Sequence, residues 1–136
     1  MNFSHILFSF NGRINRGKFW LGVLLPSAAL VIFAIVVSLV LGPLVIEVPA
    51  VGGKPATTLI NFKSAVPVGI AYLGLLWTSL AVGVKRFHDR GKSGWWVLIV
   101  LVPVIGGLWY LIELGILEGN KGPNTYGPDP LEGRRG

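Results

Sequence analysis

The chain has 136 residues, of which 52% are hydrophobic and only 13% are charged. So little polar surface does not coat a soluble globule of this size, and the apolar length leaves no room for a separate soluble catalytic domain. The net charge of +6 comes from Lys and Arg beside the apolar stretches, which indicates membrane orientation and lipid contact and not nucleic-acid binding.

The first predicted element is a short amphipathic helix over residues 1–10. Ser4 and Ser9 lie off its apolar face, and the apolar side chains recur at helical spacing at Phe3, Ile6, Leu7 and Phe10. A basic segment follows directly, so we expect this helix to lie at the membrane interface.

Three apolar stretches contain no Asp, Glu, Lys or Arg: Phe19–Ile46, Ser64–Val84 and Ser93–Ile112. A membrane-spanning helix needs about 20 apolar residues, so each stretch is long enough to cross a bilayer. The predicted fold class is therefore an all-α integral membrane protein, a single membrane domain over residues 1–136, with spans at about 19–42, 66–86 and 95–117.

The segment between the first two spans, residues 47–65, has two β-prone runs on either side of Gly52 and Gly53. Two such runs around a glycine-containing loop are typical of a β-hairpin. A flexible loop explains the same residues equally well, so both alternatives stay open.

The third stretch carries Pro103, Gly106 and Gly107 near its middle. Proline removes a backbone donor and glycine loosens a helix, so we expect the third span to be kinked between Pro103 and Gly107. A re-entrant hairpin is the alternative, and it would return the tail to the starting side. The 23 residues from Trp95 to Leu117 suffice for one crossing and are short for two, which favours the kinked span.

The carboxyl-terminal tail, residues 118–136, is rich in Gly, Pro and Asn. These residues are typical of tight turns, so the tail is predicted to be turn-rich and not helical. Tyr126 is expected to pack on the membrane face.

Lys and Arg are divided unevenly between the two sides of the predicted membrane. One side holds seven of them: Arg13, Arg16, Lys18, Lys85, Arg86, Arg90 and Lys92. The other side holds five: Lys54, Lys63, Lys121, Arg134 and Arg135. Positive charge near span ends resists translocation, so we place the amino terminus in the cytoplasm, and three spans then put the tail outside.

The basic groups beside the spans are the candidate residues for binding anionic lipid, another anion or a protein partner. Arginine supplies paired donors that suit phosphate oxygens. The candidate set is Arg13, Arg16, Arg86, His88, Asp89, Arg90 and Lys92. A second set is predicted to anchor the spans at the membrane interface and consists of Trp20, Trp95 and Trp96.

No catalytic residue, metal site or cofactor site is predicted. No nucleophile or paired metal ligand accompanies His88, and the chain has no cysteine. The sequence from Gly91 to Ser93 is similar to the end of a phosphate-binding loop, but Arg86 stands where the first glycine of that loop belongs. We therefore expect that the protein is not an enzyme.

Glu113, about one turn before the end of the third predicted span, is a candidate intramembrane polar site. Carboxylates inside a membrane often mark ion or proton paths. The spans hold no second carboxylate or basic residue that would relay a proton, so an interfacial position for Glu113 is favoured.

Small residues recur every four positions in the first two spans, for example at Ala34, Ser38 and Gly42. Small residues at this spacing let helix backbones approach closely in lipid. The pattern fits either a homo-oligomer seam or packing within one chain, and the second interpretation is favoured.

Three motifs, Gly12–Trp20, Arg86–Trp96 and Gly122–Pro130, together resemble the bacterial domain-of-unknown-function 805 family, the YhaH/YhaI-like small inner-membrane proteins. The resemblance extends from Phe10 to Pro130. It implies an integral, multi-pass protein of the bacterial inner membrane with no established activity, whose tail docks onto the rest of the chain. The sequence departs from the family pattern at Phe87 and in a longer loop between the first two spans.

Two functions follow from these features. The favoured hypothesis is a non-enzymatic inner-membrane module that binds anionic phospholipids, or a membrane protein partner, through its basic cytoplasmic loops. The alternative is an oligomeric small transporter or channel subunit, in which the break at Pro103–Gly107 and Glu113 line a path between subunits.

Overall fold

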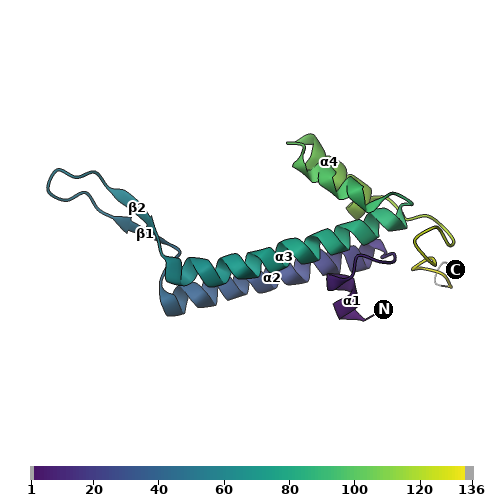
Figure 1. Cartoon of the computed structure of the whole chain (residues 1–136), viewed down its shortest axis with the longest axis horizontal. Helices are drawn as coiled ribbons and strands as arrows, with labels where there is room; N and C mark the ends of the chain where they lie inside the picture. Colours follow the sequence, from purple (N-terminus) through teal and green to yellow (C-terminus); the bar gives the residue numbers. More distant parts are fainter. Residues whose placement is uncertain (1, 134–136) are drawn as a thin grey trace. The chain divides into compact units, whose positions relative to one another are not determined.

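The computed structural model describes residues 2–133 and is built mainly from helices (Figure 1). In chain order the elements are α1 (Phe3–Phe8), α2 (Arg16–Leu41), β1 (Val45–Val48), β2 (Thr57–Ile60), α3 (Phe62–Asp89), the 3-10 helix η1 (Gly94–Leu101), α4 (Ile105–Tyr110) and the π-helix η2 (Leu111–Ile116). Met1 and residues 134–136, the last part of the predicted tail, lie outside the described residues.

The chain divides into two compact units. The described part of the first unit consists of residues 2–25 and 76–133, and the second unit consists of residues 26–75. Both long helices pass from one unit into the other, so each unit holds one end of α2 and one end of α3.

Helices α2 and α3 have 26 and 28 residues and are both long and apolar enough to cross a membrane. They follow the predicted spans at 19–42 and 66–86. Only 6% of the most apolar part of α2 and 17% of that of α3 are buried within the chain, as expected for helices that face lipid on most sides. The prediction of a helical membrane fold is confirmed in this coarse form.

The segment between α2 and α3 is a β-hairpin, so the first of the two open alternatives is confirmed and the fold is not wholly helical. Strands β1 and β2 pair antiparallel, with Val45 opposite Ile60. Gly52 and Gly53 both have positive φ angles in the turn, which glycine adopts without strain. The Ser64 hydroxyl donates to the Gly42 carbonyl at 2.6 Å and joins the helix ends beneath the hairpin.

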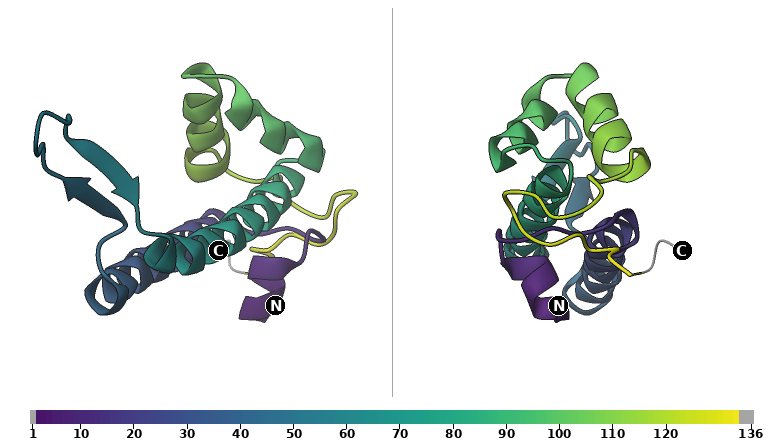
Figure 2. Two further views of the ribbon diagram at one scale, coloured as in Figure 1. Left: turned by 60° about the vertical axis from the view of Figure 1, so that its left-hand side comes forward. Right: turned by 90° about the vertical axis from the view of Figure 1, so that its right-hand side faces the viewer.

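The third apolar stretch does not form the predicted kinked span. It folds into two short arms, η1 and α4–η2, that run in opposite directions, as both views of Figure 2 show. Lys92 precedes η1 and Glu113 lies in η2, yet the Lys92 Nζ is 2.7 Å from a Glu113 carboxylate oxygen. The segment therefore returns to its starting point, which is the geometry of the re-entrant alternative.

The reversal has a local cause. Pro103 follows the last hydrogen bond of η1, from the Val102 amide to the Ile99 carbonyl at 3.0 Å, and cannot donate a further one. Gly106 then lets the arms touch, because a Cβ there would overlap the Ile99 carbonyl. The length estimate did not predict the reversal because it counted full crossings, whereas η1, eight residues at about 2 Å each, is only about half as long as the hydrocarbon core is thick.

The buried core of the first unit joins α1, α2, α3 and the two arms. Its fully or nearly buried members are Ile6, Ile14, Phe19, Val82, Phe87, Val97 and Leu114. The rings of Phe19 and Phe87 contact Tyr110, with centroids 6.3 and 6.0 Å away. Gly22 allows α2 and α3 to approach closely in this core, because a Cβ there would lie 2.8 Å from Val82. The role of the repeated small residues such as Ala34, Ser38 and Gly42 stays a prediction.

The reversal predicts the side on which the tail lies. The chain has no cysteine, so single cysteines at Ser4 and at Thr125 report separately on the two ends. We expect a membrane-impermeant maleimide to label both variants from the same side in oriented inner-membrane vesicles. Labelling of Ser4→Cys and Thr125→Cys from opposite sides would mean that the third segment crosses the membrane once.

Candidate functional site

A buried ion cluster lies where the amino-terminal segment, the end of α3 and the tail meet. We call it the arginine clasp, defined as Arg13, Arg86 and Asp89. The Arg13 guanidinium is 3.1 Å from one Asp89 carboxylate oxygen, and Arg86 pairs with the other. The exposed fractions of Arg13, Arg86 and Asp89 are 3%, 0% and 3%. One carboxylate thus serves two buried cations.

The remaining Arg13 donors hold the tail. They donate to the backbone carbonyls of Asn120 at 2.6 Å, Gly122 at 2.8 Å and Gly127 at 3.1 Å. Arg13 is therefore the residue that docks the turns of the tail, which confirms the docking that the family resemblance implies.

Arg86 holds the end of η2. Its Nε donates to the Leu114 carbonyl at 2.8 Å, and a terminal nitrogen donates to the Leu117 carbonyl. The last carbonyls of a helix have no partner within the helix, so Arg86 supplies donors that η2 lacks.

Two tail residues fit closely around Asp89. The backbone N–H of Asn120 donates to the Asp89 backbone carbonyl at 2.7 Å. Gly119 lies against the carboxylate, where a Cβ would overlap the side-chain oxygens. Nothing in the composition of the tail pointed to this contact, which brings together residues 30 positions apart along the chain.

A second ion cluster closes the base of the two arms. Glu113 is 5% exposed, and one of its oxygens lies 3.0 Å from the Arg90 Nε and 2.7 Å from the Lys92 Nζ. The Lys92 ammonium also lies 5.4 and 5.5 Å from the ring centres of Trp96 and Trp109. The carboxylate that the sequence offered as a polar site is thus held by two cations.

His88 lies between the amino-terminal segment and the tail. Its ring stacks on Tyr126, with centroids 3.9 Å apart and 4° between the planes. Its Nδ1 lies 3.3 Å from the Gly12 carbonyl, and its own carbonyl accepts a hydrogen bond from Asn124 at 2.9 Å. Tyr126 therefore packs on His88 and remains partly exposed, and its contact with the membrane face stays a prediction.

Lys85 is a structural residue that sequence reasoning did not single out. It is fully buried, and its Nζ donates to the His5 carbonyl at 2.6 Å and to the Ile6 carbonyl. These carbonyls belong to the end of α1, so Lys85 fixes that helix to α3. A cation at the carboxyl end of a helix also interacts favourably with the helix dipole.

The structure separates the predicted binding residues into two groups. Arg13, Arg86 and Asp89 are buried and occupied by internal partners. Arg16 is on the surface, where its guanidinium donates to Glu118 at 3.0 Å and to the Ile116 carbonyl at 2.9 Å. No group of three His, Asp or Glu suited to a metal ion occurs among residues 2–133.

The predicted interface tryptophans all retain exposure. Trp95 and Trp96 are 76% and 45% exposed near the start of η1. Trp20 is 36% exposed, and its indole N–H donates to the Gly115 carbonyl at 3.3 Å. A partly exposed indole with one bound N–H is compatible with a membrane interface, and the anchoring role stays a prediction.

The chain matches the model of a family described as "Protein of unknown function (DUF805)" over residues 7–128. It is 31% identical to the uncharacterized protein YiiR of Escherichia coli (strain K12), over 95% of this chain and 90% of that protein. It is 32% identical to two inner membrane proteins of the same strain, YhaH and YhaI. The alignment with YhaH covers 89% of this chain and 86% of YhaH. The alignment with YhaI covers 91% of this chain and 87% of YhaI. No solved structure matches the chain significantly.

Removal of the shared carboxylate tests the clasp. Asp89→Ala leaves two guanidinium groups buried without an anion, so we expect the free energy of unfolding in detergent micelles to fall by about 3–5 kcal/mol. Arg16→Gln is the matched control, because it breaks an ion pair whose side chains are 45% and 64% exposed, and such pairs contribute at most about 1 kcal/mol. Equal effects of the two substitutions would contradict a buried clasp.

The close fit of Gly119 gives a second test. Gly119→Ala forces Asp89 to move, and we expect a loss of about 1–3 kcal/mol in the free energy of unfolding. Gly107→Ala is the control, because the added methyl group meets no atom within 4 Å beyond its chain neighbours and the backbone of its own helix. Thermal unfolding followed by circular dichroism compares the two variants, and an unaffected Gly119→Ala variant would show that the tail does not dock on Asp89.

Proposed function

Since the chain belongs to the DUF805 family, whose function is unknown, we propose from its geometry that it is a non-enzymatic, multi-pass module of the bacterial inner membrane that binds anionic phospholipid headgroups. The exposed cations around the arginine clasp carry this proposal. The bilayer environment itself rests on the two long apolar helices and on relatives named inner membrane proteins.

The distribution of charge supports an orientation with the clasp in the cytoplasm. Of the ten Lys and Arg among residues 2–133, eight belong to the first unit, which holds the clasp. The second unit holds the other two, Lys54 and Lys63. Docking of the tail moves Lys121 to the amino-terminal side and so increases the asymmetry on which the positive-inside rule depends.

The observation that carries lipid binding is an excess of cations after the internal pairs are formed. The described part of the first unit has eight Lys and Arg against five Asp and Glu, an excess of three positive charges. Asp89, Glu113 and Glu118 are all paired internally. Lys18 and Lys121 retain solvent exposure, and neither takes part in the ion pairs of Asp89, Glu113 and Glu118.

Surface cations suit phosphate headgroups better than the clasp does. The Arg13 and Arg86 donors already have acceptors, so lipid binding through them would require the fold to open. A headgroup can reach Lys18, Lys121 and Arg16 without any opening of the fold, because these side chains retain solvent exposure. The transporter alternative has less support, because the Glu113 carboxylate is buried and is held by Arg90 and Lys92.

A triple substitution tests the proposal. Each cation near an anionic leaflet contributes about 1 kcal/mol, so Arg16→Gln with Lys18→Gln and Lys121→Gln should weaken binding at least about tenfold. The protein is reconstituted in mixed phosphatidylcholine and phosphatidylglycerol liposomes, extracted gently, and its bound lipid is counted by native mass spectrometry. We expect the ratio of phosphatidylglycerol to phosphatidylcholine to fall in the variant.

The matched control is the double variant Lys54→Gln with Lys63→Gln, which removes both described cations of the second unit. It should leave the lipid ratio unchanged. An unchanged ratio in the triple variant would contradict the proposal, and a ring of several subunits without enriched lipid would favour the transporter alternative.

A further inference from the structure

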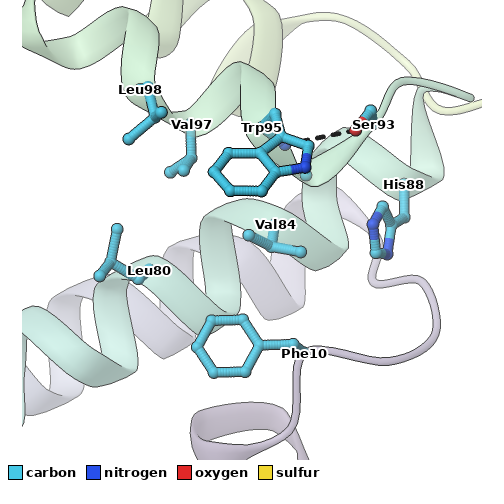
Figure 3. A pocket seen from close by; sticks show the side chains of 9 residues that line it. Phe10, Leu80, Val84, His88, Ser93, Trp95, Val97 and Leu98 are labelled. Atoms are coloured by element: carbon cyan, nitrogen blue, oxygen red, sulfur yellow. Dashed lines mark hydrogen bonds between the residues drawn. The ribbon is translucent and has the colours of Figure 1, made fainter.

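A cavity of about 470 Å³ lies beside the end of α3, within the first unit (Figure 3). This volume is in the usual range for small-molecule sites. Most of the lining is apolar and includes Phe10, Leu80, Val84, Trp95 and Leu98. Figure 3 shows His88 and Ser93 at one end of the cavity and Leu80 and Leu98 at the other.

The wall of the cavity is fixed by contacts outside it. The Phe10 ring packs edge-on against Trp77, with centroids 5.2 Å apart. The His88 ring is held by the Tyr126 stack. An apolar cavity with a positioned polar end is suited to an amphiphile, whose apolar part and head group require different surroundings.

The hydrogen bonds of His88 determine which chemical groups of a ligand can bind at its end of the cavity. A carbonyl can only accept, so the contact with Gly12 places the proton of the neutral imidazole on Nδ1. The Nε2 is then an acceptor, and no residue among those described donates to it. The Ser93 hydroxyl oxygen accepts a hydrogen bond from the backbone N–H of Trp95 at 3.4 Å, which leaves the hydroxyl proton free to donate.

We propose that this cavity binds a membrane amphiphile whose head group donates a hydrogen bond to the Nε2 of His88. The apolar part of the ligand lies against Phe10, Leu80 and Trp95. An acceptor in an apolar site discriminates against ligands without a donor, because it is left unpaired when they bind. The chemical class is thus a lipid with an ammonium or hydroxyl donor, and the residues that would bind it are different from the surface cations of the proposed function.

Solid-state nitrogen-15 NMR of labelled histidine observes the proposed hydrogen bond directly. The chain has two histidines, and His5→Gln leaves His88 as the only signal. The starting liposomes are phosphatidylcholine, whose quaternary ammonium has no donor, at a pH where His88 is neutral. Phosphatidylethanolamine or dioleoylglycerol is then added in separate samples, to distinguish an ammonium from a hydroxyl source.

We expect the Nε2 resonance of His88 to move upfield with at least one of the two added lipids and not with more phosphatidylcholine. Leu80→Trp fills the cavity at the end away from His88 and should abolish the shift. Leu73→Trp, on the same helix outside the cavity lining, should retain it.

Three outcomes would overturn the proposal. The first is an unchanged Nε2 resonance with both added lipids. The second is an Nε2 that is already hydrogen-bonded in pure phosphatidylcholine. The third is an equal shift in the Leu80→Trp variant, which would place the donor outside the cavity. None of these outcomes bears on the lipid ratio that tests the surface cations, so the two proposals fail separately.

Discussion

One carboxylate between two buried guanidinium groups, Asp89 between Arg13 and Arg86, is the interaction on which the first unit depends. Buried cations are tolerated only when they are paired and their other donors are hydrogen-bonded. The clasp has two cations and one anion, so backbone carbonyls of the tail and of η2 complete it. The tail, the arms and the amino-terminal segment are therefore one electrostatic assembly, although they are far apart in the sequence.

The return of the third segment follows from the same requirement. The carbonyls at the end of η2 and just after it need donors, and three arginines supply them: Arg86 at Leu114, Arg16 at Ile116 and Arg90 at Glu118. A third helix that crossed the membrane would carry these carbonyls and Glu113 away from the basic end of α3. The arginines would then lose their acceptors, and Glu113 would lose its two cations. The break at Pro103 and Gly106 makes the return sterically feasible.

The sequence was sufficient to predict the helices α2 and α3, because a long charge-free run has few alternatives to a lipid-facing helix. It was insufficient for the third stretch, since residue counting assumed that each arm had to cross the full hydrocarbon core. The clasp residues were identified as a set but were taken to face solvent or lipid. Their acceptors are mostly backbone carbonyls between Leu114 and Gly127, and a carbonyl acceptor has no residue signature. The contacts of Lys85 with the carbonyls of His5 and Ile6 were missed for the same reason. The close fit of Gly119 against the Asp89 carboxylate was missed because it depends on how the tail docks.

The hairpin of the third segment also affects how the protein enters the membrane. In the proposed orientation, residues 42–63 are the main polar stretch that must be translocated, and they carry only Glu47, Lys54 and Lys63 as charges. The tail, with Glu118 and Lys121, stays on the side where it is synthesised. Since each charge carried into the bilayer core costs about 2.5–3.5 kcal/mol, an insertion route that exposes few charges to lipid is favoured.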